Sequence, residues 1–112
     1  MHVTYTHIGQ NKGKPRIFLE GKRLADCGFT RDARYNLLLV ESGLEFKLLL
    51  KLDANGARKV SWRRRRGLSD FKEIKTDIPI VDILNASVID LPFGTRIRAI
   101  FRTGDIEVTL HH

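Results

Sequence analysis

Residues 34–52 read RYNLLLVESGLEFKLLLKL, two alternating apolar segments on either side of a short polar turn at Ser42-Gly43. The apolar positions are Tyr35, Leu37 and Leu39 in the first segment and Leu44, Phe46, Leu48 and Leu50 in the second. Alternation with a period of two places such side chains on one face of a strand. The stretch therefore predicts a β-hairpin with one buried face.

A second hairpin is predicted over residues 95–110, TRIRAIFRTGDIEVTL, with its turn at Thr103-Gly104. A shift of 62 residues brings the apolar positions of the first hairpin onto those of the second, which are Ile97, Ala99, Phe101, Ile106, Val108 and Leu110. Each hairpin is also preceded by a short strand and a brief helical segment. These are residues 16–20 and 21–29 in the first half, and residues 78–84 and 85–91 in the second.

The chain therefore reads as two βαββ-like units, one over about residues 15–62 and one over about residues 78–110. A unit of this size cannot bury its own apolar face, so the two units are expected to close on each other. We predict a single domain over residues 1–112, of the α+β class and mostly β. Its expected form is a small pseudo-twofold barrel with a basic loop between the units.

Three connecting segments carry weaker signals. The first dozen residues read as a loose polar arm. Asn55-Gly56 is a strong turn signal, and it predicts that residues 58–62 fold back on the strand formed by residues 44–52. Residues 63–77, RRRRGLSDFKEIKTD, have neither a helical nor a strand period, and they are expected to form a mobile basic linker.

Composition restricts the class of protein. With 112 residues, of which 42% are hydrophobic, the chain can build one core, and intrinsic disorder is disfavoured. No apolar run approaches the roughly 20 residues of a membrane span, so no membrane partner is expected. The single cysteine, Cys27, cannot form an internal disulfide, which favours a reducing, cytoplasmic location.

Positive charge is concentrated in one part of the chain. The formal net charge is +7, and the window from Lys51 to Lys75 holds nine basic and three acidic residues, or +6 of that total. Such a concentration creates a field that attracts polyanions, although a solvated loop of like charges is the alternative. The residues expected to contact nucleic acid are Arg63, Arg64, Arg65 and Arg66, together with Lys59 and a second set, Lys22, Arg23, Arg31 and Arg34, around the first helical turn.

Trp62 stands immediately before the four arginines. Arginine pairs bidentately with phosphate and stacks on bases, and an adjacent aromatic ring adds a surface for stacking. Trp62 is also in register with Val60, and a place in the core is the interpretation that we favour over base stacking.

No catalytic constellation is evident. Cys27 follows Asp26 and lacks a histidine partner placed by sequence. The loop from Gly9 to Gly13 has three residues between its glycines, where a phosphate-binding loop needs four. The histidines lie near the two ends of the chain, without cysteine or aspartate at ligand spacing. We expect a protein that is not an enzyme and has no metal or cofactor.

Residues 16–39, RIFLEGKRLADCGFTRDARYNLLL, resemble the swapped-hairpin group typified by AbrB, MazE and SymE-type proteins. The shared pattern is a strand, G-x-x-L at Gly21 to Leu24, x-x-G-F ending at Phe29, a turn and a strand. The resemblance implies DNA binding by basic residues near strand–helix junctions and dimers built from one unit per chain. Because this chain holds two units, it is expected to be a monomer or a homodimer.

A second resemblance rests on residues 7–24, HIGQNKGKPRIFLEGKRL, on residues 32–39 and on residues 78–83. These segments are similar to the non-catalytic region that precedes the catalytic domain in some mobile-element DNA cytosine-5 methyltransferases. The likeness implies a DNA-targeting accessory domain, because the Pro-Cys nucleophile and the Gly-rich cofactor loop of those enzymes are missing here.

The expected function is non-catalytic binding of nucleic acid, double-stranded DNA in the first place, through an arginine-rich loop. Two alternatives stay open. One is an inhibitor or adaptor that binds a protein, such as a host-defence or DNA-modification enzyme. The other is a SymE-like toxin directed at RNA.

Overall fold

The computed structural model describes residues 1–42, 45–69, 72–84 and 91–111, without the side chains of residues 41, 42, 45, 65–69 and 72–76. The described part contains one five-residue helix, α1 (Lys22–Asp26), and ten strands. The strands are β1 (His2–His7), β2 (Gly9–Asn11), β3 (Lys14–Glu20), β4 (Arg34–Ser42), β5 (Glu45–Leu52), β6 (Arg58–Lys59), β7 (Ser61–Ser69), β8 (Lys72–Ile83), β9 (Arg96–Arg102) and β10 (Asp105–Leu110).

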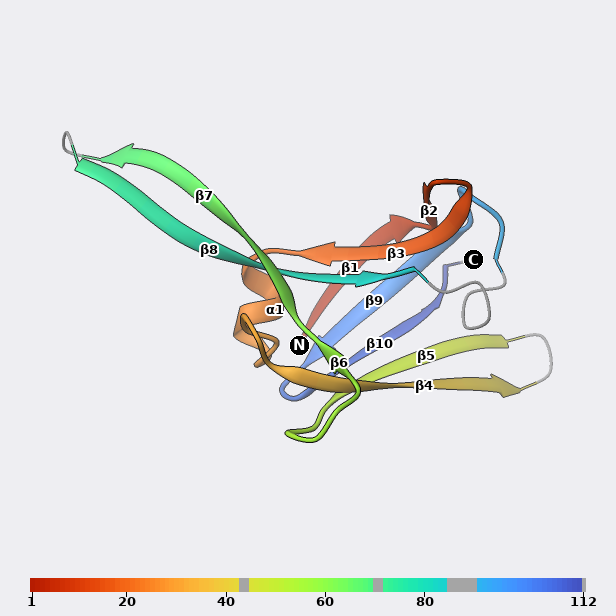
Figure 1. The fold of residues 1–112 in the computed structure, drawn as a ribbon. Coiled ribbons are helices and arrows are strands. Elements are labelled where there is room, and N and C mark those ends of the chain that lie inside the picture. The colour runs from red at the N-terminus through yellow and green to blue at the C-terminus, as the bar shows by residue number, and fades with distance from the viewer. Residues whose placement is uncertain (43–44, 70–71, 85–90, 112) are drawn as a thin grey trace.

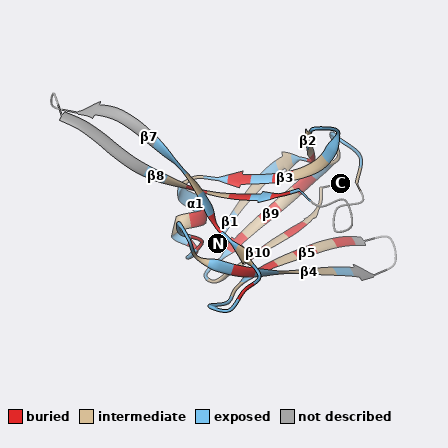
Figure 2. Ribbon diagram, in the orientation of Figure 1, coloured by how far each residue is buried: buried red, intermediate tan, exposed pale blue. Residues whose placement is uncertain are grey.

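The strands form two antiparallel sheets, a six-stranded one in the order β1-β9-β10-β5-β4-β6 and a four-stranded one in the order β2-β3-β8-β7 (Figure 1). One hydrophobic core draws on both sheets and on the helix. Ile17 and Val81 come from the smaller sheet, Leu48 and Val108 from the larger one, and Leu24 from α1, and all five are fully buried (Figure 2). The mostly-β, α+β class is confirmed.

The strand before α1 and the helix itself lie where the sequence predicts them. The backbone N–H of Phe29 donates to the carbonyl of Leu24, and Gly28 closes the helix with a φ of +96°. Glycine adopts this left-handed conformation without strain, which explains the sharp end of the helix.

Both predicted hairpins are present, as β4–β5 and β9–β10, but the offset that relates them differs from the expected one. Ser42 pairs with Glu45 in the first hairpin, and Arg102 pairs with Asp105 in the second. An offset of 60 residues superposes these pairs, and the predicted shift of 62 is wrong. The alternation of apolar residues fixes only whether the offset is even, whereas the turns set its value.

The burial expected from the alternation is largely observed. Phe46, Ile97, Phe101 and Val108 are buried. Leu37 and Leu39 are only partly buried and pack against the edge of the core.

The N-terminal residues form a strand, contrary to the predicted loose arm. All of His2–His7 pairs with β9, from His2 opposite Phe101 to His7 opposite Arg96. Valine, threonine and tyrosine favour extended backbone, and the pairing satisfies the outer edge of β9.

The segment after Asn55-Gly56 does not return to the strand that precedes it. The turn is present, with the N–H of Gly56 donating to the carbonyl of Asp53, but β6 pairs with β4, placing Arg58 opposite Tyr35. The predicted pairing with β5 is wrong because β4 and β10 already occupy the two edges of β5.

Residues 63–77 are not a linker, because β7 and β8 run through them as an antiparallel hairpin. β8 pairs with β3 only from Ile80 to Ile83. From the Trp62–Pro79 pair outward to the Ser69–Lys72 pair, β7 and β8 pair only with each other. This outer segment, here called the ribbon, extends away from the rest of the molecule (Figure 1), whose principal extents are 55 × 29 × 26 Å. Backbone hydrogen bonds between the two strands do not depend on apolar alternation, so a hairpin can form here without that period.

The helical turn expected at residues 85–91 lies almost wholly outside the described residues. Among the residues that are described, no helix has the length and apolar character needed to cross a membrane.

Candidate nucleic-acid interface

The arginine run lies on β7, so its members do not share one face. Successive side chains of a strand point to opposite sides of the sheet. The Nε atom of Arg63 donates to Glu20 Oε2 at 3.0 Å, whereas Arg64 Nε lies 3.6 Å from Asp77 Oδ1. Both arginine side chains are about half exposed. Arg65 and Arg66 continue the strand, and their side chains lie outside the described part of the structure.

Trp62 lies at the base of the ribbon between two cations. The guanidinium carbon of Arg31 is 3.6 Å from the ring centroid, and that of Arg64 is 5.5 Å away. The residue is partly buried and does not belong to the core. The interpretation of Trp62 as a core residue is therefore wrong, and its ring serves as a platform for arginine.

Asp77 joins the two arginines that flank this ring. Arg31 Nη1 donates to Asp77 Oδ2 at 2.8 Å. That hydrogen bond, followed by the charges of Arg31 and Arg64, holds the pKa of Asp77 below the ordinary value of an aspartate. The carboxylate is thus kept ionised and offsets part of the positive charge at the ribbon base.

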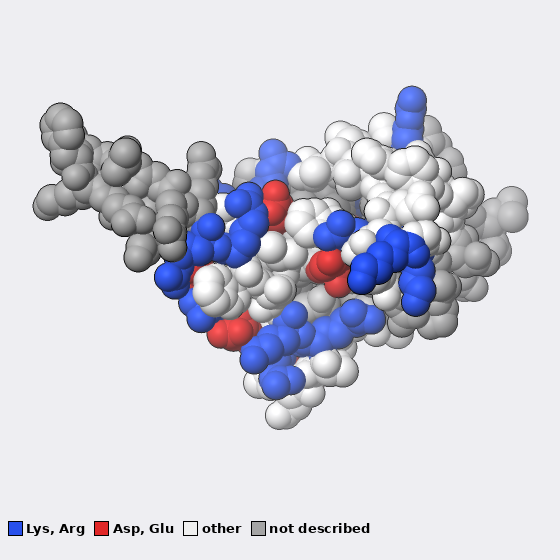
Figure 3. Space-filling view, turned by 45° about the horizontal axis from the view of Figure 1, so that its top comes forward, with Lys and Arg blue, Asp and Glu red and all other residues white. Residues whose placement is uncertain are grey.

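The turn before β4 brings further charge to the same place. The N–H of Asp32 donates to the carbonyl of Val60, which fixes the turn beside the chain that enters β7. Lys59 Nζ lies 3.7 Å from Asp32 Oδ1, and Arg31 Nε lies 3.5 Å from Asp32 Oδ2. Figure 3 shows Lys and Arg side chains gathered where the ribbon leaves the body, with Asp and Glu side chains among them.

The fold brings Arg31, Lys59 and Arg64 together, with Arg63 on the other face of the same strand. It gives different roles to two other predicted site residues. Arg23 donates to the carbonyl of Val3 and to the hydroxyl of Thr4, so it ties α1 to β1. Arg34 donates to the carbonyl of Gly56 and braces the turn between β5 and β6. Lys22 is exposed on α1.

Sequence reasoning missed the acidic partners, Glu20 and Asp77. Each is far from its arginine along the chain, and the hairpin that places Asp77 opposite Arg64 has no apolar period to reveal it. Both carboxylates also lie outside the window from Lys51 to Lys75, so the tally of charges there does not include them.

The thiol of Cys27 is a structural group. Its Sγ donates to the carbonyl of Leu24, and burial raises the pKa of the thiol. A raised pKa lowers the thiolate fraction on which nucleophilic reactivity depends.

Comparison of the chain with protein-family models, with curated proteins and with solved structures gives no match.

Proposed function

We propose that this protein binds double-stranded DNA without catalysing a reaction, and that the β7–β8 ribbon is the element that enters the DNA surface. The observation that carries the proposal is the pairing of Trp62–Pro79 through Ser69–Lys72 as a two-stranded ribbon that projects beyond the rest of the sheet and bears the arginine run.

The dimensions of the ribbon support this proposal. At about 3.3 Å per residue, its paired length is roughly 23 Å. The major groove of B-DNA is about 12 Å wide and admits a two-stranded β-ribbon. A ribbon that inserts in this way presents both faces to the groove walls, so arginines on opposite faces can contact the two phosphate backbones.

The charge of the ribbon supports it as well. Residues 62–79, which span the ribbon, include six basic and three acidic residues. Each phosphate that a lysine or arginine neutralises releases condensed counterions, which drives binding at low salt. Arg31 and Lys59 extend this positive surface at the ribbon base.

The ion pairs already present do not prevent phosphate contact. The pairs Arg63–Glu20 and Arg64–Asp77 are both solvent-exposed, and exposed pairs contribute little because water screens them. A phosphate can therefore replace the carboxylate. Glu20 and Asp77 would hold the arginines extended and reduce repulsion between them until DNA binds.

We also infer that the two halves of the chain are related by an internal pseudo-twofold axis and close into a small barrel. Three pairings at an offset of 60 support this inference. The two hairpins share one register, Leu48 of β5 lies opposite Val108 of β10, and Glu20 of β3 lies opposite Ile80 of β8. In an antiparallel pair, a twofold axis relates the two strands. One chain would then supply both halves of an assembly that the AbrB- and SymE-like group builds from two.

A salt titration tests DNA binding. The affinity of the wild-type protein for duplex DNA is compared with that of the variant Arg63→Ala/Arg64→Ala/Arg65→Ala/Arg66→Ala. We expect weaker binding and a slope of log K against log salt that is smaller by roughly 3–4 if all four arginines contact phosphates. Unchanged affinity and slope in a variant that stays folded would overturn the assignment to the ribbon.

Two charge-neutralising variants provide a sharper test, because they should tighten DNA binding, whereas the loss of the arginines should weaken it. Glu20→Gln releases Arg63, and Asp77→Asn releases Arg64 and Arg31, so each should tighten duplex binding by about 2–5-fold. Asp82→Asn is the matched control, since it breaks the comparably exposed pair with Arg16 in the body of the sheet. An equal gain from all three variants would indicate only a change in net charge.

Duplex DNA, single-stranded DNA and RNA are compared in the same titration. The absence of binding to all three at near-physiological salt would exclude the proposal in favour of a protein partner. A clear preference for RNA would favour the toxin alternative.

A further inference from the structure

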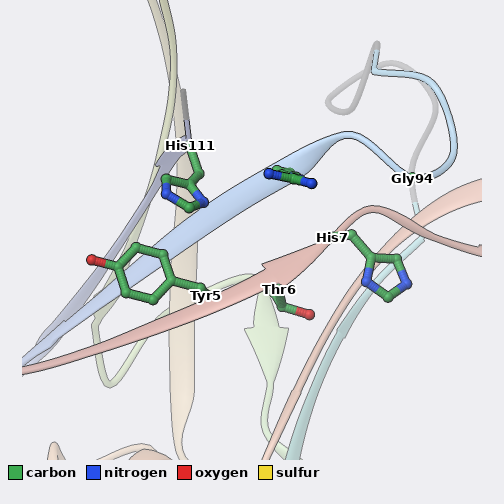
Figure 4. A pocket seen from close by; sticks show the side chains of 6 residues that line it. Tyr5, Thr6, His7, Gly94 and His111 are labelled. Atoms are coloured by element: carbon green, nitrogen blue, oxygen red, sulfur yellow. The ribbon is translucent and has the colours of Figure 1, made fainter.

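A shallow groove of about 420 Å³ lies at the corner where β1 ends and β9 begins, apart from the ribbon (Figure 4). The residues that line it are Tyr5, Thr6, His7, Gly94, Arg96 and His111. Among these described lining residues there is one guanidinium, two imidazoles and two hydroxyl groups, and none is acidic. The groove is thus suited to an anionic ligand.

Strand pairing fixes the groove. His7 of β1 lies directly opposite Arg96 of β9, and Tyr5 lies opposite Arg98. Tyr5 and His7 are two residues apart on one strand, so they share a face. The N–H of His111 donates to the carbonyl of Arg96, which brings the C-terminal end of the chain to the same corner.

Two exposed aromatic rings flank these polar groups. The Tyr5 ring lies 4.6 Å from that of His111, and the Phe93 ring stands edge-on to that of His7 at 6.3 Å. Tyr5 is 60% exposed and Phe93 is 65% exposed. Figure 4 shows the rings of Tyr5 and His111 close together on one side of the groove and His7 on the other.

The turn that carries Phe93 is held in place by backbone hydrogen bonds. The N–H of Gly94 donates to the carbonyl of Ile8, and the N–H of Ile8 donates to that of Thr95. Within the turn, Thr95 donates to Pro92 from both its N–H and its hydroxyl, and Gly94 adopts a φ of +86°. These hydrogen bonds hold the exposed Phe93 ring beside His7, where a ligand in the groove can reach both rings.

We propose that this corner groove binds a segment of single-stranded nucleic acid, as a second site separate from the ribbon. Unpaired bases stack on aromatic rings, and the cations beside the rings contact the backbone phosphates. Tyr5 and Phe93 supply the stacking surfaces, Arg96 supplies the cation, and the His7 ring supplies a further hydrogen-bonding group. A duplex hides its bases, so the groove selects unpaired nucleotides.

The first test maps binding by NMR, with oligothymidylate and oligouridylate of about eight nucleotides as probes. We expect shift changes concentrated at residues 5–7 and 93–96. Shifts confined to the ribbon, or no shifts at all, would overturn the proposal. Shifts at the groove that are the same with inorganic phosphate or a mononucleotide, with no gain in affinity from chain length, would overturn it too.

The second test uses variants at the rings and at the cation. Phe93→Leu and Tyr5→Leu keep apolar bulk but remove the ring, and each should weaken oligonucleotide binding by at least about 5-fold. Arg96→Gln should lower the salt slope by about 0.7. The matched controls are Leu38→Ala, an exposed apolar residue on β4, and Lys51→Gln, an exposed cation on β5, which should have little effect.

The ribbon variant separates this proposal from the DNA-binding one. The fourfold arginine variant should lose duplex binding and keep the binding of short oligonucleotides at the groove. If the ring variants bind oligonucleotides as the wild type does, the groove proposal fails and the ribbon proposal stands. If duplex binding is absent but the ring variants weaken oligonucleotide binding, the ribbon proposal fails and the groove proposal stands.

Discussion

The guanidinium carbon of Arg31 lies 3.6 Å from the centroid of the Trp62 ring, and the same guanidinium donates to Asp77 at 2.8 Å. Three segments that are distant in sequence meet here: the turn before β4, the start of β7 and the middle of β8. The base of the ribbon is therefore anchored by a stacked cation and an ion pair in contact with water.

Acid titration of the Trp62 fluorescence reports on this anchor, because Trp62 is the single tryptophan of the chain. The pKa of Asp77 is lowered in the folded protein, so its pairing with Arg31 is present at neutral pH and is lost as the pH falls through that lowered pKa. We expect the midpoint of the fluorescence change to move to higher pH in Arg31→Ala, and by less in Arg31→Lys. An unchanged midpoint in Arg31→Ala would show that the pairing is not maintained in solution.

A second charge network lies on the larger sheet. Glu107 Oε2 accepts a hydrogen bond from Arg102 Nη2 at 2.6 Å, and Glu107 Oε1 lies 3.1 Å from Lys47 Nζ; these partners lower the pKa of Glu107. The pKa of Glu107 is lower in the folded protein than in the unfolded chain. The pairing of Glu107 with Arg102 and Lys47 therefore stabilises the fold above the unfolded pKa, and this stabilisation is lost as the pH falls through the folded pKa. Glu107→Gln should reduce the thermal midpoint at neutral pH and converge with the wild type in acid. Thermal unfolding at several pH values checks this, and parallel curves at all pH values would contradict it.

Gly56 is required where β6 approaches β4. A Cβ atom at this position would lie 2.6 Å from the carbonyl oxygen of Tyr35, a backbone atom that cannot move aside. Gly56→Ala should lower the free energy of unfolding by about 1–3 kcal/mol, as measured by urea denaturation. Gly9→Ala is the control, since its Cβ would meet its nearest neighbour at an ordinary 3.7 Å. Equal effects of the two variants would argue against the close approach of β6 to β4.

The contact between the two hairpins is expected to dominate stability. Leu50 of β5 and Ile106 of β10 are directly opposite each other and fully buried. Truncation of either side chain to alanine should lower the free energy of unfolding by about 2–5 kcal/mol. In the double variant the two losses should not be additive, because the side chains share one packing site. Leu38→Ala on the exposed face should change stability by less than about 0.5 kcal/mol, and strictly additive losses at Leu50 and Ile106 would contradict the pairing.

The arginine run shows how far local sequence reaches into the candidate site. The distribution of basic residues along the sequence located the positive charge at residues 63–66. It also indicated Arg31 and Lys59 as site residues, and the fold does bring these two close to Arg64. It could not locate Glu20 or Asp77 as partners, because the contacts that select them cross between strands. The chemistry of the site was thus readable from residue types, whereas its geometry was not.

The sequence by itself determined the elements whose signals are local. The hairpins at residues 34–52 and 95–110 follow from alternation and turn residues, and the end of α1 follows from Gly28. Only the tertiary structure decided how these elements pair. Both edges of β5 are paired with β4 and β10, so β6 pairs with β4 instead. The N-terminal residues, expected to be a loose arm, pair with the remaining edge of β9 and form β1. Residues 63–77 have no apolar period that could reveal the ribbon, which is defined by the pairing of β7 with β8. Strand pairing depends on which backbone edges are open after the chain has folded, and no local pattern of side chains encodes that.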